Sequence, residues 1–301
     1  MIVCYNLTSS ISEYPDKSLL TKFTIYLRGA LGYCIKDVNK ELYYYCFKPK
    51  RSKFRGYLLK KLRYIPKPII ITPPIIFNDK INFKVRVFGS LIYYEKDIID
   101  ALSKLSERDL HGVKLRILSI EYLNEMFNIS SKIFNGKYER KDSKKFVITD
   151  KDIKDFSKKI INMSKDYIEF SIESKTPIMI VKDGINVIEK RCLNLSNLIA
   201  YGCRRRSLLS YFYGKGLYYT AEEVNSMIDY ANKNSEVLRF ESKESDIKLK
   251  GRKGFYYVNV SFKVKIDDSI AVKIIELLKF CEFMGIGKMV SFGMGQYELK
   301  F

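Results

Sequence analysis

The sequence contains only one histidine, His111, and six cysteines that never form a C-x-x-C pair. A metal site with two histidine ligands is therefore excluded within this chain, and neither a thiolate zinc site nor a disulfide framework is expected. Scattered cysteines fit a reducing compartment, so we expect the protein in the cytoplasm. We expect no metal and no other cofactor.

Long apolar runs are also missing. No stretch of the sequence approaches the roughly 18–20 apolar residues that a membrane-spanning helix needs. The first residues, MIVCYNLTSSISEYPD, lack the basic and then apolar profile of a signal peptide. We therefore expect no association with a membrane.

Two fingerprints of nucleotide-binding enzymes are absent from the sequence. It has no G-x-x-x-x-G-K-[ST] segment, and the glycines near its end do not have G-x-G-x-x-G spacing. Those glycines also follow a predicted helix and precede a predicted strand, which reverses the order of a dinucleotide site. These absences disfavour a metabolic enzyme that uses a nucleotide cofactor.

Acidic residues are few beside basic ones. The 301 residues include 54 lysines and arginines against 34 aspartates and glutamates, so the formal net charge is +20. Such an excess favours a polyanionic partner, with nucleic acid ahead of an anionic membrane surface. A lysine-rich composition inherited from an AT-rich genome is the alternative explanation.

Apolar patterning predicts a similar order of elements twice along the chain. The first half is predicted to hold, in order, a strand at Ile2–Leu7, a helix at Ser18–Lys36, an extended segment at Lys67–Phe77, a strand at Ile81–Phe88, a helix at Asp97–Leu105 and a strand at Val113–Tyr122. The second half is predicted to hold a strand at Tyr167–Ile172, a helix through NLSNLIAYGCRRRSLLSYFYG, a helix at Ala221–Ala231, strands at Val237–Ser242 and through GFYYVNVSFKV, a helix at Ser269–Phe283 and a final strand.

This order is typical of the split βαβ pattern. We therefore predict an α+β protein with two tandem ferredoxin-like (RRM-like, βαββαβ) domains, at residues 1–126 and 166–301. The polar residues 127–165 are expected to form a linker, and residues 285–295 a glycine-rich loop.

The segment GIGKMVSFGMGQYELKF holds four glycines close together before the final strand. Glycines of this kind let backbone amides approach phosphate oxygens, with Lys288 adding positive charge. They equally suit a helix C-cap followed by a β-bulge, where glycine supplies a positive φ. The residues alone leave both interpretations open.

Several basic residues are candidates for binding RNA. Rings that alternate with cations around Phe47 and Phe54 suit single-stranded RNA, because rings stack on unpaired bases while cations follow the backbone. A solvated basic loop is the alternative. Three consecutive arginines on a helix spread over about 200–300°, so we expect one or two of them to meet phosphates. The candidates are Arg28, Lys50, Arg51, Lys53, Arg55, Arg204, Arg205, Arg206, Arg252 and Lys253.

The segment GIGKMVSFGMGQYEL resembles the C-terminal glycine-rich motif of the RAMP superfamily, the RNA-binding proteins of CRISPR systems. It is most similar to the motif of their repeat-processing endoribonucleases, in which Gly-Lys is followed by Ser-Phe-Gly-x-Gly. Further segments are similar in order: YLRGALGYCIK, ITPPIIF, FKVRVFGSLIYYEKDIIDAL, TPIMIV and CRRRSLLSYFYG.

This resemblance implies a metal-independent endoribonuclease that binds CRISPR precursor RNA between two ferredoxin-like domains. The 2′-OH would attack the adjacent phosphate, leaving a 2′,3′-cyclic phosphate and a 5′-OH. The glycine-rich loop would hold RNA through Gly285, Gly287, Lys288, Ser291, Phe292, Gly293 and Gly295. A homodimer and partner proteins of a CRISPR effector complex are further expectations.

The chemistry needs a base for the 2′-OH, an acid for the leaving oxygen and cations for the developing charge. Many members of the family place a histidine in or just after the first helix, whereas this sequence has none there. Its catalytic candidates are His111, whose residue type has an ordinary pKa near 6.5, and Tyr33 with Lys48. A turn role for His111 and a slow Tyr/Lys site are both open. A non-catalytic subunit that holds guide RNA is the alternative function.

Overall fold

The computed structural model describes residues 1–301 except 13–16, 50–64, 78, 140 and 248–253. The chain divides into two compact units, each with its own antiparallel sheet. The N-terminal unit comprises Met1–Ile148, Phe212–Gly214 and Ser291–Gly293, and the C-terminal unit comprises Thr149–Tyr211, Lys215–Val290 and Met294–Phe301. The α+β class predicted from the sequence is confirmed.

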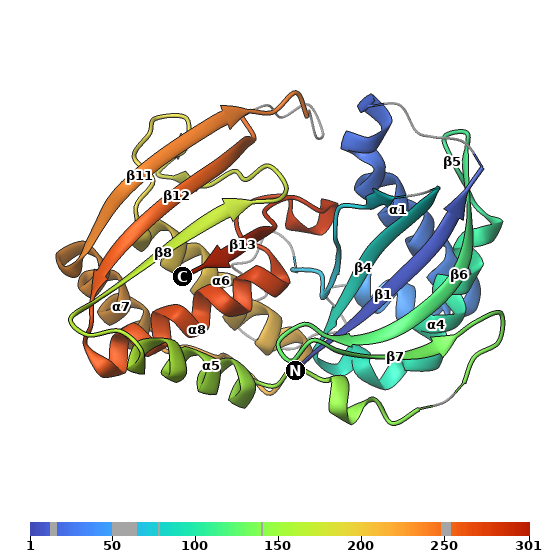
Figure 1. Cartoon of the computed structure of the whole chain (residues 1–301), viewed down its shortest axis with the longest axis horizontal. Coiled ribbons are helices and arrows are strands. Elements are labelled where there is room, and N and C mark those ends of the chain that lie inside the picture. The colour runs from blue at the N-terminus through green and yellow to red at the C-terminus, as the bar shows by residue number, and fades with distance from the viewer. Residues whose placement is uncertain (13–16, 50–64, 78, 140, 248–253) are drawn as a thin grey trace. The chain divides into compact units, whose positions relative to one another are not determined.

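The sheet of the N-terminal unit has the strand order β2-β4-β1-β6-β5, with β3 paired to β4 and β7 paired to β6. Its strands are β1 (Ile2–Ile11), β2 (Ile69–Ile71), β3 (Ile75–Phe77), β4 (Lys80–Phe88), β5 (Asp109–Leu110), β6 (Val113–Asn124) and β7 (Ile129–Phe134). Figure 1 shows the helices α1 (Lys17–Val38) and α4 (Glu95–Ser103) together on one face of this sheet. The short helix α2 (Lys40–Cys46) follows α1.

Apolar side chains at every second position of β4 show which face of this sheet is covered. On β4, Ile81, Phe83, Val85 and Val87 are all buried. They meet the buried face of α1, where Phe23, Leu27 and Leu31 recur at helical spacing. The residues between them on β4 point to the opposite face, which is polar.

The sheet of the C-terminal unit has the order β11-β12-β8-β13, and every pairing in it is antiparallel. Its strands are β8 (Tyr167–Ser174), β11 (Ser235–Glu244), β12 (Tyr256–Lys265) and β13 (Tyr297–Lys300), and β9 (Val181–Lys182) with β10 (Ile185–Asn186) forms a small separate ribbon. The helices are α5 (Asp150–Asn162), α6 (Leu195–Tyr213), α7 (Ala221–Asn234) and α8 (Asp268–Met284), and Figure 1 shows them on one side of the sheet. No described helix is long and apolar enough to cross a membrane.

The strands and helices predicted from apolar patterning are present, but the predicted linker is wrong. Residues 127–165 contain β7, which pairs with β6 in the N-terminal unit, and α5, which belongs to the C-terminal unit. The division between the units therefore falls between Ile148 and Thr149 rather than across a linker. Helix α5 buries Ile153, Ser157 and Ile161 at intervals of one turn, and its many lysines hide this stripe in the sequence.

A buried carboxylate fixes one end of the polar face of the N-terminal sheet. Glu125 accepts hydrogen bonds from Nε and Nη2 of Arg86 at 2.6 and 2.8 Å and from Nζ of Lys84 at 2.7 Å. Burial raises the pKa of Glu125, but the two cations outweigh burial and lower this pKa from 4.5 to about 2. The charged form is thus stabilised by the fold.

This lowered pKa predicts a loss of stability in acid. The carboxylate contributes to the free energy of unfolding above pH 4.5, and the contribution disappears as the pH falls from about 4.5 to about 2. The difference between the two pKa values corresponds to roughly 3 kcal/mol. We expect Glu125→Gln to lower the free energy of unfolding at neutral pH. We also expect this free energy, measured by denaturant unfolding, to depend less on pH between about 4.5 and about 2 than in the wild type. Glu121→Gln, on the same sheet face, is the control; an equal effect from it would contradict the assignment.

Candidate nucleic-acid interface and active site

The N-terminal unit holds a cation between two aromatic rings. Arg28 lies on α1, and its Cζ is 5.3 Å from the ring centre of Phe47 and 4.6 Å from that of Phe292. Phe47 follows α2, whereas Phe292 comes from the glycine-rich segment. Burial lowers the pKa of Arg28, against the influence of Tyr43 and Cys46. Neither phenylalanine ring neutralises the guanidinium, so its charge remains available to a phosphate.

Arg28 borders a small cavity of the same unit. Thr24, Lys67, Ser291 and Gly293 also line it. The cavity measures about 10 Å³, which is about the space of one water molecule. A nucleotide therefore cannot enter it, and RNA would have to lie against its rim, where two cations and two hydroxyl groups come together.

Helix α2 brings a tyrosine and a second cation to the same cluster. The side chain of Asn39 caps this helix by accepting a hydrogen bond from the Leu42 N–H at 2.9 Å. One turn later, the ring of Tyr43 stacks on that of Phe47, with centres 5.9 Å apart. The ammonium group of Lys48 lies 6.0 Å from the Tyr43 ring centre. Lys48, predicted to be catalytic, is therefore close to the Arg28 cluster.

His111 and Tyr33 do not join this cluster. His111 occupies a two-residue turn between β5 and β6 with a φ of 56°, so its role as a turn residue is part of the structure. Its ring lies 4.0 Å from that of Tyr26, which is two residues from Arg28 and thus on nearly the opposite face of α1. Tyr33 follows Tyr26 by two turns and is 62% exposed. His111 and Tyr33 therefore lie near the face of α1 that carries Tyr26, whereas Lys48 lies near the face that carries Arg28.

The glycine-rich segment uses several of its backbone amides inside the protein, those of Gly285, Ile286, Lys288 and Gly295. The N–H of Gly285 donates to Cys281 O at 2.7 Å and ends α8, and the N–H of Lys288 donates to Met179 O at 2.9 Å. Gly295 donates to Pro177 O and accepts from Ile286 N–H. These geometries match the cap-and-bulge interpretation at these four positions, whose amides are already bonded. Binding of phosphate by the rest of the segment stays a prediction. What the segment offers to RNA is its side chains, with Ser291 and Phe292 beside Arg28.

Close packing explains why glycine is required in this segment. Gly287, Gly293 and Gly295 all have positive φ, and a Cβ atom at each would overlap Met179 O, the Thr24 side chain and Ile286 O, respectively. The tight turn is therefore fixed by shape, whatever it binds.

Replacing Gly295 should disrupt the fold. We expect Gly295→Ala to lower the melting temperature sharply or to yield insoluble protein, because a φ of 73° and a backbone overlap act together. Gly136→Ala is the control: that glycine also has a positive φ, of 81°, but its Cβ would meet open space. Only backbone strain of roughly 1–2 kcal/mol is expected there. Equal melting temperatures for the two variants would contradict this packing argument.

The three consecutive arginines of α6 have three different environments. Arg204 is exposed. Arg205 is half-buried and donates from Nε to Met284 O at 2.6 Å, at the end of α8. Arg206 is fully buried. The prediction that Arg206 contacts RNA is therefore wrong, and Arg204 is the one of the three whose exposure suits a phosphate.

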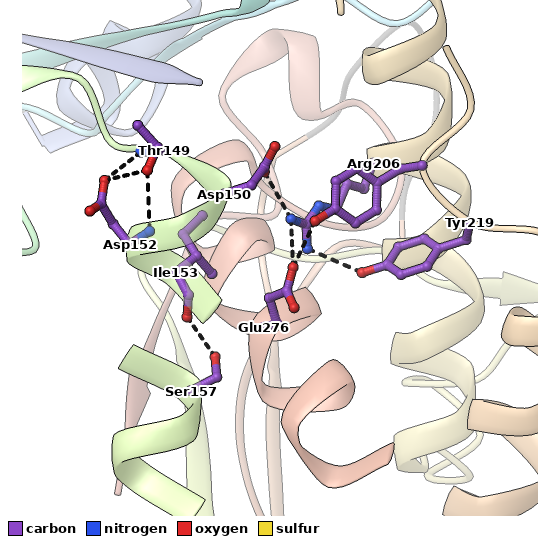
Figure 2. A network of polar contacts seen from close by, with 9 residues as sticks. Thr149, Asp150, Asp152, Ile153, Ser157, Arg206, Tyr219 and Glu276 are labelled. Carbon is purple, nitrogen blue, oxygen red and sulfur yellow. Dashed lines mark hydrogen bonds and ion pairs between the residues drawn. The ribbon is translucent and has the colours of Figure 1, made fainter. Parts of the chain in front are cut away.

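Arg206 forms the centre of a buried polar network (Figure 2). Its Nη2 donates to Asp150 on α5 and to Glu276 on α8, each at 2.9 Å, and Nη1 donates to the Tyr219 hydroxyl at 3.1 Å. The ring of Tyr218 lies 3.6 Å from the guanidinium. Two carboxylates and two tyrosines thus compensate the desolvation of one cation.

Removing this guanidinium should unfold the C-terminal unit more easily. We expect Arg206→Ala to lower the free energy of unfolding by about 3–5 kcal/mol, because Glu276 is left buried without its counter-charge. Arg204→Ala, two residues away and exposed, should leave stability unchanged and weaken RNA binding. Thermal unfolding and RNA titration of both variants measure this. A destabilised Arg204→Ala, or a fully stable Arg206→Ala, would contradict the division of roles.

Six of the predicted RNA-binding residues lie outside the described part of the chain: Lys50, Arg51, Lys53, Arg55, Arg252 and Lys253. Their assignment stays a prediction. Conversely, sequence reasoning missed Thr24 and Lys67 as parts of the cluster around Arg28. Lys67 begins the segment that was predicted to be extended, and only the fold brings it close to Arg28. Among described residues, no three His, Cys, Asp or Glu side chains converge as metal ligands would.

Residues 172–297 match the family model of the CRISPR-associated endoribonuclease Cas6. This segment, somewhat less than half of the chain, is similar to the Cas6 family. The resemblance to CRISPR repeat-processing endoribonucleases is thereby confirmed, and the match includes the glycine-rich segment.

Solved Cas6 structures are similar over almost the whole chain. Thermus thermophilus Cas6 has 11% sequence identity and a TM-score of 0.58, covering 99% of this chain and 98% of that chain. The same Cas6 in a product complex has 13% identity and a TM-score of 0.61, covering 99% of this chain and 100% of that chain.

A chain of a partial Cas6-RT-Cas1–Cas2 complex has 13% identity and a TM-score of 0.52, covering 99% of this chain and 46% of that chain. At such identities these likenesses show a shared fold. No curated protein matches the sequence.

Proposed function

We propose that this chain binds CRISPR precursor RNA and cleaves it within the repeat. The match of residues 172–297 to the Cas6 family model and the net charge of +20 both support an RNA substrate. The observation that carries the proposal is the cluster in which Arg28 lies between Phe47 and Phe292, beside Tyr43 and Lys48. A half-buried cation, a phenol and an ammonium group are the components that phosphate transesterification requires.

The proposed reaction begins when the 2′-OH of one nucleotide loses its proton and attacks the adjacent phosphorus. The bond from phosphorus to the 5′-oxygen breaks, and that oxygen takes up a proton. The products are a 2′,3′-cyclic phosphate and a 5′-OH. No step in this sequence passes through a metal ion.

Each component of the cluster has a role in this reaction. Arg28 stabilises the negative charge that develops on the phosphorane oxygens, and Lys67 on the cavity rim adds to this field. Tyr43 and Lys48 exchange the protons at the 2′- and 5′-oxygens. Phe47 and Phe292 hold the guanidinium in place without cancelling its charge. Tyrosine and lysine ordinarily titrate about three or more pH units above neutrality, so turnover is slow, as suits an enzyme that keeps its product.

The fold assignment belongs to the same proposal. We infer that both units are ferredoxin-like. The orders β2-β4-β1-β6 and β11-β12-β8-β13 support this, because each follows the arrangement 2-3-1-4 in chain order. A non-catalytic subunit that holds guide RNA is the competing function, since no histidine occupies α1. A homodimer and an effector complex are further proposals that these observations leave to experiment.

Cleavage without metal is the first test. Purified protein is incubated in EDTA with repeat RNA and with the same RNA carrying one 2′-deoxy nucleotide at the mapped cut site. We expect cleavage of the first and none of the second, because the 2′-oxygen is the nucleophile. Tight binding with both RNAs intact would instead support the non-catalytic subunit.

Substitutions then test whether the active site lies at the cluster around Arg28. We expect Tyr43→Phe and Lys48→Ala each to lower the single-turnover rate at least tenfold, and Arg28→Ala to lower it about a hundredfold. Arg28→Lys should recover part of that loss. His111→Ala and Tyr33→Phe are matched controls on the other face of the helix and should cleave at the wild-type rate. The reverse pattern, with His111→Ala inactive and the Tyr43 and Lys48 variants active, would move catalysis to that face.

A further inference from the structure

The hairpin of β3 and β4 exposes two large apolar side chains. Ile75 is 68% exposed and Phe77 is 69% exposed, although the neighbouring β4 residues Ile81 and Phe83 are buried. Ile75 and Phe77 are two residues apart on one strand, so both lie on the same face of the sheet. An exposed phenylalanine and isoleucine side by side indicate a surface that meets a ligand.

The register places charged groups in line with Phe77. Phe77 pairs with Lys80, Lys80 pairs with Ser10 on β1, and Ser10 pairs with Arg116 on β6. Lys80 and Arg116 are exposed, and Ser10 is half-buried. Since adjacent strands lie about 4.8 Å apart, the ring, the two cations and the hydroxyl form one row across roughly 14 Å.

A second row runs parallel to the first. Ile75 pairs with Asn82, and Asn82 pairs with Thr8, whose hydroxyl donates to Asn82 Oδ1 at 2.8 Å. Thr8 in turn pairs with Ser119. We call these two rows, from Phe77 to Arg116 and from Ile75 to Ser119, the sheet platform. The platform contains two cations and no carboxylate, while Asp79 lies beside it in the hairpin turn.

The open face of the other sheet differs in charge. There, Glu173 pairs with Lys300 and Lys175, Glu298 pairs with Lys175, and Glu169 pairs with Lys263. Its cations are thus matched by acids, whereas Lys80 and Arg116 stand in rows without one. The two rows of the sheet platform therefore carry an excess of positive charge, which suits a polyanion.

We propose that the sheet platform binds a single-stranded segment of RNA, with a base stacked on Phe77 and backbone phosphates on Lys80 and Arg116. An exposed ring beside regularly spaced cations is what sequence-tolerant single-strand binding requires. Asn82, Thr8 and Ser10 offer hydrogen bonds to bases or to the 2′-OH. The proposal rests on the proposed function in that the RNA is the same substrate, held here away from the Arg28 cluster.

The test measures binding of a short fluorescent oligouridine RNA by anisotropy at several salt concentrations. We expect Phe77→Ala to weaken binding about tenfold, and Phe77→Tyr to restore it, because stacking is lost and regained. Lys80→Gln and Arg116→Gln should each reduce the salt slope by about 0.7, the value for one phosphate of a single strand. Phe127→Ala, at another exposed phenylalanine of the same unit, is the control and should bind as the wild type does.

Cleavage of repeat RNA by the wild type is measured in parallel at saturating enzyme. If the wild type cleaves and Phe77→Ala binds oligouridine as tightly as Phe127→Ala, the sheet platform is overturned and the proposed function stands. If Phe77→Ala loses oligouridine binding while the wild type never cleaves, the platform stands and the proposed function fails. A Phe77→Ala change in sedimentation with unchanged RNA binding would assign the face to a protein and overturn the proposal.

Discussion

The C-terminal unit depends on one buried guanidinium. Arg206 on α6 bonds Asp150 at the start of α5 and Glu276 on α8, so three helices share a single cation. Its neighbour Arg205 bonds the carbonyl of Met284, where α8 ends and the glycine-rich segment begins. This hydrogen bond from Arg205 therefore ties the start of the glycine-rich segment to the packing of α6 against α8. A buried ion network gives little net stability, but it makes other helix packings costly because each would leave a charge unpaired.

The candidate site in the N-terminal unit uses cations differently. Arg28 and Lys48 lie against aromatic rings, which hold a positive charge in place without neutralising it. The same residue types thus serve two purposes in one chain, and their partners reveal which. Carboxylate partners mark a cation that supports the fold, as at Arg206 and Arg86, whereas aromatic partners without a carboxylate leave the positive charge unneutralised.

Local pattern in the sequence was sufficient for most elements of the fold. Alternation over Ile81–Phe88 and helical spacing over Asp97–Leu105 reflect burial by neighbours that are close in space, and both elements are present. Helix α5 was missed because lysines dominate its composition, although Thr149 and Asp152 form a capping box at its start. The site was harder to predict. Which of Arg204, Arg205 and Arg206 is buried, and which face of α1 carries Arg28, depends on contacts with residues far away in sequence, so spacing alone could not decide it.

The cavity beside Arg28 has a consequence for the order of events during synthesis. Thr24 and Arg28 leave the ribosome early, whereas Ser291 and Gly293, which belong to the same unit, are made only after all of the described C-terminal helices. The nascent N-terminal half can form its sheet but cannot complete this wall. This wall, and any contact with RNA that depends on it, is therefore complete only once synthesis has passed the glycine-rich segment.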